Sequence, residues 1–241
     1  LQFKFSQQWK KLKAYANANG IRIIGDIPIY VAMDSADTWA HPELFELDRE
    51  NRPTAVAGCP PDGFSATGQL WGNPLYRWDV QEKTDFAWWK ERMKASGRLY
   101  DVVRIDHFIG VVQYYAIPAG AEDGRTGEWL KGPGKKLTDA IGQVIGDTKI
   151  IAEDLGIITK EVTALRTRLG LPGMRILQFA FDGHADNLYL PHNFETNTVV
   201  YTGTHDNDTT LGWWNGLAPH EQDYVRRYLG INGESIHWAL I

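Results

Sequence analysis

Three acidic residues each follow a short run of β-branched and aliphatic residues. Asp106 ends the run Val-Val-Arg-Ile-Asp, Glu153 follows Ile-Ile-Ala, and Asp206 lies in Thr-Gly-Thr-His-Asp-Asn-Asp. Nearly continuous apolar runs are typical of buried parallel strands. In a parallel α/β barrel all strand carboxyl ends open on one face, so the three acids would share one pocket. Because desolvation and like charge both oppose ionisation there, such a cluster indicates chemistry. The expected strands are Val102–Ile105, Lys149–Ala152 and Val199–Thr202.

The surroundings of the first two acids indicate different protonation states. Arg104 lies two residues before Asp106, so in a strand both side chains project to the same side. The guanidinium would keep Asp106 ionised, as a nucleophile requires. Glu153 has no cation beside it in the sequence, and neighbouring acids would raise its pKa, as a general acid requires. Such a pair is the equipment of a retaining glycosidase, and Asp206 would bind sugar hydroxyls and favour the cationic transition state.

Each acid also has a purely structural interpretation. Asp106 and Arg104 could form only a salt bridge. Glu153 could cap the following helix, for which Asp154 is better placed. Residues 205–208 could form a cluster of Asx turns. The occurrence of all three acids after successive strands favours the chemical interpretation.

The composition is that of an ordinary globular protein of 241 residues, with 43% hydrophobic and 23% charged residues. That length suits one large or two small domains. A net charge of −5 argues against nucleic acid as a partner. No apolar stretch is long enough to span a bilayer, and no signal peptide is visible. The single cysteine, Cys59, excludes an internal disulfide and is compatible with a reducing compartment.

Helical and strand patterns alternate along the chain, which predicts an α/β fold with a parallel sheet. We expect further strands at Ile21–Ile24 and Arg175–Phe181, and an irregular stretch from Gly110 to Gly134. The expected helices run from Ser6 to Ala18, from Asp79 (in a capping box with Glu82, with a break at Gly97), from Lys136 to Ile145, from Thr159 to Gly170, and from Pro219 to Leu229 with Gly230 after it. Five strands cannot close an eight-stranded barrel, so we expect a piece of a larger barrel.

Residues 26–78 form a long segment, rich in Pro and Gly, after the first strand. Loops of that length are uncommon unless they are functional or disordered. This one holds too many aromatic residues for disorder, and we interpret it as an inserted lid or subdomain. Indole rings in such loops offer flat apolar faces suited to sugars. The aromatic residues are Trp39, Phe45, Phe64, Trp71 and Tyr76.

Several motifs resemble those of the 4-α-glucanotransferases (amylomaltase, or disproportionating enzyme), a family of the α-amylase superfamily. Arg-Ile-Asp106-His, Ala-Glu153-Asp-Leu-Gly and Thr-Gly-Thr-His205-Asp206-Asn-Asp-Thr-Thr are similar to its catalytic motifs. Gly25-Asp26-Ile-Pro-Ile-Tyr30-Val resembles its first strand-end motif. The stretch from Pro60-Pro-Asp62 to Tyr76 resembles its active-site lid. The likeness runs from about Gly20 to Trp214.

The resemblance implies a (β/α)₈ TIM-type barrel, of which residues 1–241 would be a catalytic fragment, with no essential cofactor and no metal. It makes Asp106 the nucleophile, Glu153 the acid/base and Asp206 the transition-state stabiliser. Maltooligosaccharides and other α-1,4-glucans would be the partners, with no nucleic acid and no membrane. The cytoplasm, or the plastid stroma in a plant, would be the location. The implied substrate-binding residues are Arg104, His205, Asp26, Tyr30, Asp62, Gln69, Trp71, Asn73 and His107.

The leading functional hypothesis is therefore a retaining enzyme that transfers α-1,4-glucan segments to an acceptor glucan or glucose. A hydrolase of the same superfamily would pass the same covalent intermediate to water, and only the lid, as a water shield, speaks against it. A barrel that holds Mg²⁺ on three strand-end acids is a different class, disfavoured by Arg104 beside Asp106. A non-catalytic glucan-binding module is disfavoured by the intact acid trio.

Overall fold

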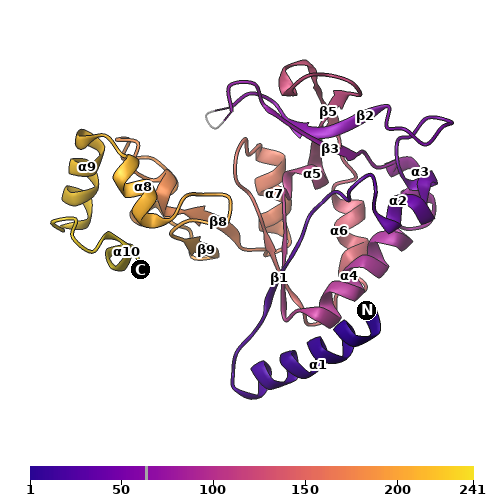
Figure 1. Cartoon of the computed structure of the whole chain (residues 1–241), viewed down its shortest axis with the longest axis horizontal. Coiled ribbons are helices and arrows are strands. Elements are labelled where there is room, and N and C mark those ends of the chain that lie inside the picture. Colours follow the sequence, from indigo (N-terminus) through magenta and orange to yellow (C-terminus); the bar gives the residue numbers. More distant parts are fainter. Residues whose placement is uncertain (63–64) are drawn as a thin grey trace. The chain divides into compact units, whose positions relative to one another are not determined.

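The chain folds into two compact units, Leu1–Leu169 and Gly170–Ile241 (Figure 1). The computed structural model describes residues 1–62 and 65–241. Phe64, one of the aromatic residues expected in the lid, lies outside the described residues.

Three short parallel strands carry the candidate acids of the first unit. They are β1 (Ile24–Ile27), β4 (Val102–Ile105) and β7 (Lys149–Ala152), in the order β1-β4-β7. The expected bounds of β4 and β7 are confirmed. Ile27, Ile105 and Ala152 are level in the register, so the next residues of β4 and β7 leave the sheet at the same edge.

The first strand lies three residues later than expected. Ile21 and Ile24 are exposed, so the apolar run 21–24 does not mark the buried strand. Burial instead begins at Gly25, whose backbone packs against the ring of Tyr100 so closely that a Cβ would lie 2.0 Å from its Cδ2 atom. The shift places Asp26 inside β1, opposite Arg104 in the register.

The helices of the first unit differ from expectation mainly at their ends. The Asp79–Glu82 capping box is absent, because α3 has Arg77 at its N-cap and no side-chain cap. The helix breaks at residues 84–86 rather than at Gly97, which stays inside α4. Thr159 caps α7 by accepting from Val162 N, as expected. These helices are α1 (Gln2–Ala18), α2 (Ala36–Ala40), α3 (Trp78–Lys83), α4 (Ala87–Leu99), α5 (Ile109–Val112), α6 (Lys135–Gly142) and α7 (Lys160–Arg168), with 3-10 turns η1 (Pro42–Leu44) and η2 (Gly124–Thr126).

A second, antiparallel sheet combines the insertion with the stretch expected to be irregular. Its order is β3-β2-β5-β6, so strands from 55–74 pair with strands from 113–131. The expectation of an irregular 110–134 was wrong because β5, with Tyr115 and Ile117 buried, is stabilised by pairing with a distant segment. In Figure 1 this sheet lies beyond the carboxyl ends of the parallel strands, opposite α1. The strands are β2 (Ala55–Cys59), β3 (Gln69–Pro74), β5 (Gln113–Pro118) and β6 (Glu128–Lys131).

The second unit holds the parallel pair β8 (Gly173–Ile176) and β9 (Thr198–Tyr201). The strand expected to reach Phe181 ends at Ile176, because the chain turns into the 3-10 helix η3 (Leu177–Phe179). Pro219 begins α9 and the left-handed Gly230 ends it, as expected. The other elements are η4 (Pro191–Asn193), α8 (Thr210–Gly216), α9 (Pro219–Leu229) and α10 (Ile236–Ala239). Among the described helices of the chain, none is long and apolar enough to cross a membrane.

Candidate active site

Arg104 joins two acids at the carboxyl end of the parallel sheet. Its Nη1 atom lies 2.8 Å from both carboxyl oxygens of Asp26, and its Nη2 atom lies 2.7 Å from Oδ1 of Asp106. Arg104 is 9% exposed, whereas the side chains of Asp26 and Asp106 are 46% and 40% exposed. Burial would lower the pKa of Arg104, but the acids around it outweigh burial and raise it. The guanidinium is therefore a fixed cation behind two accessible carboxylates.

The turn after β4 points a backbone donor at Glu153. Asp106 N donates to Ile27 O at 3.0 Å, which ties the turn to β1. His107 has φ +50°, a left-handed conformation that is uncommon for a side-chain-bearing residue. In this conformation His107 N donates to Oε2 of Glu153 at 2.7 Å. The left-handed residue thus links the turn that carries Asp106 to the acid on the next strand.

Glu153 is buried, with 7% exposure, and both of its carboxyl oxygens accept backbone hydrogen bonds. The second donor is Leu155 N, 2.8 Å from Oε1. The pKa of Glu153 is raised to about 7, chiefly by burial and further by the charge of Asp106, although the two N–H donors and Arg104 oppose the rise. At neutral pH the carboxyl group can therefore both give and take a proton. We had expected neighbouring acids to cause this rise, but burial is the larger cause.

Aromatic rings from β3 and from the segment after β1 surround His107. The Trp71 ring meets the His107 ring edge to face, with centroids 4.8 Å apart, and lies 6.3 Å from the ring of Tyr30. Gln69 orients this indole by accepting from Trp71 Nε1 at 2.9 Å. Burial lowers the pKa of His107 to about 4, so the imidazole is neutral at pH 7. Its Nε2 atom is inaccessible to solvent and has no hydrogen-bond partner among the described residues.

The remaining lid residues of the expected set have structural contacts. Asn73 Nδ2 donates to Val31 O at 2.9 Å, so β3 is fixed to the segment after β1. Asp62 Oδ1 accepts from Ser65 N at 2.9 Å, and Asp62 N donates to Ser65 O at 3.0 Å.

His205 and Asp206 belong to the second unit, at the tip of a turn after β9. Both side chains are exposed, and His205 Nε2 lies 3.5 Å from Asp206 Oδ1. Asn207 shapes the turn, since its Oδ1 accepts from Thr204 N at 2.8 Å and from Thr204 Oγ1 at 3.0 Å. These bonds run from Asn207 back to Thr204 and so differ from the expected Asx-turn pattern, in which the side chain accepts from an N–H two residues later. They leave Asp206 accessible to a ligand.

Hydrogen bonds, ion pairs and ring contacts therefore link most of the expected residues of the first unit. One set is polar, with Asp26, Arg104, Asp106, His107 and Glu153, and the other is aromatic, with Tyr30, Gln69, Trp71 and the ring of His107. The meeting of these residues with Asp206 stays a prediction. Among the described residues, no group of three or more His, Cys, Asp or Glu is arranged to hold a metal ion.

Sequence reasoning missed two residues that support this site. Arg92 of α4 donates from Nη2 to Pro28 O at 2.6 Å and from Nη1 to Ile29 O at 3.2 Å, across more than 60 residues. Asp154, considered as a helix cap, is instead buried against Arg166 of α7. No local sequence signal identifies the partner in either contact. The only signal is the presence of charged residues in otherwise apolar surroundings.

The parallel strands with a carboxyl pair at their ends place the chain among α/β proteins with a strand-end acid site. The profile of the family described as 4-alpha-glucanotransferase matches residues 1–241, so the chain belongs to this family. It is 55% identical over 248 residues to a 4-alpha-glucanotransferase of Thermus thermophilus and 51% identical over 244 residues to one of Clostridium butyricum. Both alignments cover 100% of this chain but 50% of the relative, so the chain spans about half the length of these relatives.

A solved structure shows the same fold. The amylomaltase from Streptococcus agalactiae in complex with acarbose superposes with a TM-score of 0.95 at 43% identity. The match covers 99% of this chain and 49% of that protein.

Proposed function

We propose that the complete protein is a 4-α-glucanotransferase that transfers α-1,4-glucan segments by a retaining double displacement. The observation that carries the proposal is the pairing of two unlike carboxyl groups. Asp106 is accessible and held by Arg104, whereas Glu153 is buried with a pKa raised to about 7. A carboxyl group paired with a guanidinium suits a nucleophile, and one with a pKa near neutrality suits an acid/base catalyst.

In the first displacement a carboxylate oxygen of Asp106 attacks the anomeric carbon of the donor glucan. Glu153 gives its proton to the glycosidic oxygen, so the leaving glucan departs with a free 4-hydroxyl group. In the second displacement the Glu153 carboxylate takes the proton from the acceptor hydroxyl, whose oxygen attacks the same carbon and releases Asp106. Two inversions retain the α configuration.

The other residues would bind or stabilise the sugar. Asp206 is proposed to favour the positive charge that develops on the sugar ring, with His205 beside it. Arg104, itself bound by Asp26, would hold Asp106, and Arg104 and Asp26 would contact hydroxyl groups. The aromatic wall of Tyr30 and Trp71, with His107, would contact the C–H faces of the glucan. Asp62, Gln69 and Asn73 would complete the cleft.

The finer fold is also a proposal: the complete protein would close a (β/α)₈ barrel, to which these parallel strands contribute. In this interpretation the antiparallel sheet, together with the rest of residues 26–78, forms a lid over the strand ends. The cytoplasm or plastid stroma remains the expected location, and α-1,4-glucans the expected partners.

Incubation of the complete protein with maltotriose tests the activity. Longer oligomers together with glucose mean transfer, because a glucan acceptor has resolved the intermediate. Maltose and glucose alone would mean hydrolysis, and the protein would then be a hydrolase rather than a transferase. Asp106→Asn should abolish both reactions, and unchanged turnover in that variant would contradict the assignment of the nucleophile.

A further inference from the structure

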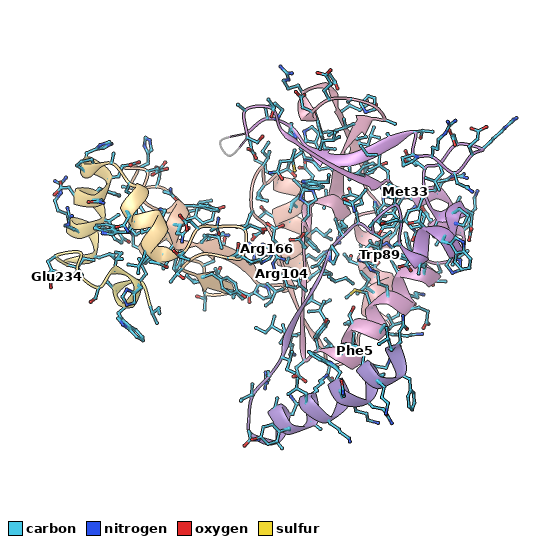
Figure 2. The ribbon with its side chains drawn as sticks, viewed as in Figure 1. Phe5, Met33, Trp89, Arg104, Arg166 and Glu234 are labelled. Atoms are coloured by element: carbon cyan, nitrogen blue, oxygen red, sulfur yellow. The ribbon has the colours of Figure 1, made fainter. Side chains whose placement is uncertain are left out.

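A buried ion pair lies directly behind Glu153. Asp154 is 4% exposed and Arg166 of α7 is 3% exposed, and Oδ2 of Asp154 lies 3.2 Å from Nε of Arg166. Figure 2 labels Arg166 together with Arg104, the cation of the neighbouring site. Desolvation offsets much of the attraction between charges this deeply buried, so the pair is weak evidence for a contribution to stability alone.

The pair anchors the segment that connects β7 to α7. Residues 153–159 connect β7 to α7 without regular structure, and Gly156 and Ile157 are exposed. α7 itself is fixed, since Val162 and Leu165 are buried and the helix packs against α5. Asp154 therefore joins this segment to α7 immediately after Glu153.

The anchored segment also carries a donor to the Glu153 carboxyl group. Leu155 N, one residue beyond Asp154, lies 2.8 Å from Oε1 of Glu153. Asp154 thus stands between Glu153 and the N–H group that orients it. A shift of Asp154 would move that donor and remove the bond that fixes Oε1 of Glu153, while His107 N still holds Oε2.

We propose that Asp154 and Arg166 are positioning residues that align the Glu153 carboxyl group for proton transfer. The inference rests on the proposed function, in which Glu153 is the acid/base. Asp106 is held separately, by Arg104 and by its N–H bond to Ile27 O. The pair should consequently affect steps that need a proton from Glu153 and leave the nucleophilic attack almost unchanged.

Two glycosyl donors distinguish proton transfer by Glu153 from nucleophilic attack by Asp106 in the complete protein. Maltotriose has a sugar leaving group that needs a proton, whereas α-maltosyl fluoride releases fluoride ion without one. The variants are Asp154→Asn, Arg166→Lys and the double variant D154N/R166M, which removes both charges of the pair together. The kcat/KM for each donor reports formation of the glycosyl-enzyme.

In Asp154→Asn and in the double variant, kcat/KM for maltotriose should fall about tenfold or more, since misalignment removes part of the general-acid contribution. The kcat/KM for α-maltosyl fluoride should fall less than about threefold in the same variants. Arg166→Lys keeps the charge and should therefore retain part of the maltotriose activity that Asp154→Asn and the double variant lose. Fluoride release also reports folding, because an unfolded fraction lowers both values alike.

The exposed pair Lys135 and Asp139 on α6 gives the matched control. Removal of both of its charges should leave kcat/KM unchanged for maltotriose and for α-maltosyl fluoride. Glu153→Gln should lose maltotriose activity and keep fluoride release. Suppose that Glu153→Gln loses only the maltotriose activity, but that the Asp154 and Arg166 variants lower kcat/KM equally for maltotriose and α-maltosyl fluoride. The pair is then merely structural, and the inference is overturned. If Glu153→Gln lowers kcat/KM equally for both glycosyl donors, Glu153 is not the general acid, and the inference fails with that assignment.

Discussion

At the scale of single residues, the protonation of Glu153 results from opposing forces that its sequence neighbours do not reveal. Two backbone N–H donors and Arg104 favour the ionised carboxylate, while burial and Asp106 favour the acid. The resulting pKa of about 7 lies near neutrality, where one group can serve as acid in one step and as base in the next. The surroundings thus fit both halves of a double displacement.

The raised pKa of Glu153 makes the stability of the protein depend on pH. The pKa is near 4.5 in the unfolded chain and about 7 in the folded one, so the native state keeps a proton that the unfolded state has lost. The free energy of unfolding therefore falls as pH rises from about 4.5 to 7. Relative to Glu153→Gln, the wild type should lose up to about 3 kcal/mol over this range.

Urea unfolding of both proteins at pH 4.5 and pH 8 measures this effect. The difference between the two pH values is the quantity of interest, because a constant effect of the substitution cancels from it. A wild type and a variant that change in parallel with pH would contradict the raised pKa.

Cys59 should be a bystander. Burial, with the charges of Asp62 and Glu153, raises the pKa of this thiol to about 12, so it is neutral at pH 7 and a poor nucleophile. Cys59→Ala should leave transfer from maltotriose within about threefold of the wild type. Loss of several orders of magnitude in that assay would show that the nucleophile has been misassigned.

At the scale of elements, the parts predicted well are those whose signal is local. The runs 102–105 and 149–152 are apolar except for Arg104 and Lys149, as is typical of strands in a covered parallel sheet, and their bounds were predicted correctly. Strand β5 was missed because its stability comes from pairing with β2, more than 50 residues away. The same limit hid Arg92 and the Asp154–Arg166 pair, whose partners are distant in sequence or buried. The contact of Arg104 with Asp106 could be predicted from their spacing, whereas the two backbone donors to Glu153 could not. The catalytic roles of the acids stay a prediction.

Helix α4 should stabilise the segment after β1 through Arg92. Its guanidinium donates to the carbonyls of Pro28 and Ile29 and lies over the rings of Trp88 and Trp89, at 5.3 and 4.9 Å from their centroids. Arg92→Met should lower the free energy of unfolding by about 1–2 kcal/mol, because the buried carbonyl of Ile29 loses a donor.

Chemical denaturation tests this stability effect, with Lys94→Met as the control. Lys94 lies on the same helix in an exposed ion pair with Glu91, and its loss should cost less than about 0.5 kcal/mol. Arg92→Lys should fall between the two. Equal effects of the Arg92 and Lys94 substitutions would show that the bonds to the carbonyls contribute nothing.

Strand β3 should act through Trp71 as a shield against water. A glycosyl-enzyme reaches a sugar acceptor before water only if water is excluded and the acceptor is positioned. Trp71, with Tyr76 and with Phe64 outside the described residues, was expected to form this apolar wall. Tyr76, however, is buried, with 1% exposure, and donates to Ile29 O, so it supports the wall from behind.

Trp71→Ala should therefore raise the ratio of hydrolysis to transfer while the intermediate still forms. Glucose released from maltotriose, compared with the longer oligomers formed, measures that ratio. Tyr76→Phe, which keeps the ring, should leave the ratio unchanged. If Trp71→Ala lowers both rates and keeps their ratio, the indole binds the donor sugar and the shield hypothesis fails.

At the scale of the whole molecule, the exposed apolar surface of the first unit needs an explanation. In the described part of the chain, β1 and β7 are the two edges of the parallel sheet. Ile24 on β1 is exposed, and so are several apolar residues of α1, namely Phe3, Phe5, Leu12 and Tyr15. Soluble proteins seldom leave an open strand edge beside an apolar helix face. In the proposed barrel, neighbouring strands and helices of the complete protein cover both.

The chain expressed alone should consequently behave differently from the complete protein. We expect it to associate in size-exclusion chromatography and to bind a hydrophobic dye, because the open edge and the apolar face are ready-made contacts. Phe5→Lys and Tyr15→Lys on α1 should reduce dye binding by the isolated chain, since they place charge in the exposed face. In the complete protein the same substitutions should instead lower stability, because there the face is proposed to be buried. An isolated chain that stays monomeric and binds no dye, together with a complete protein indifferent to both substitutions, would contradict the barrel.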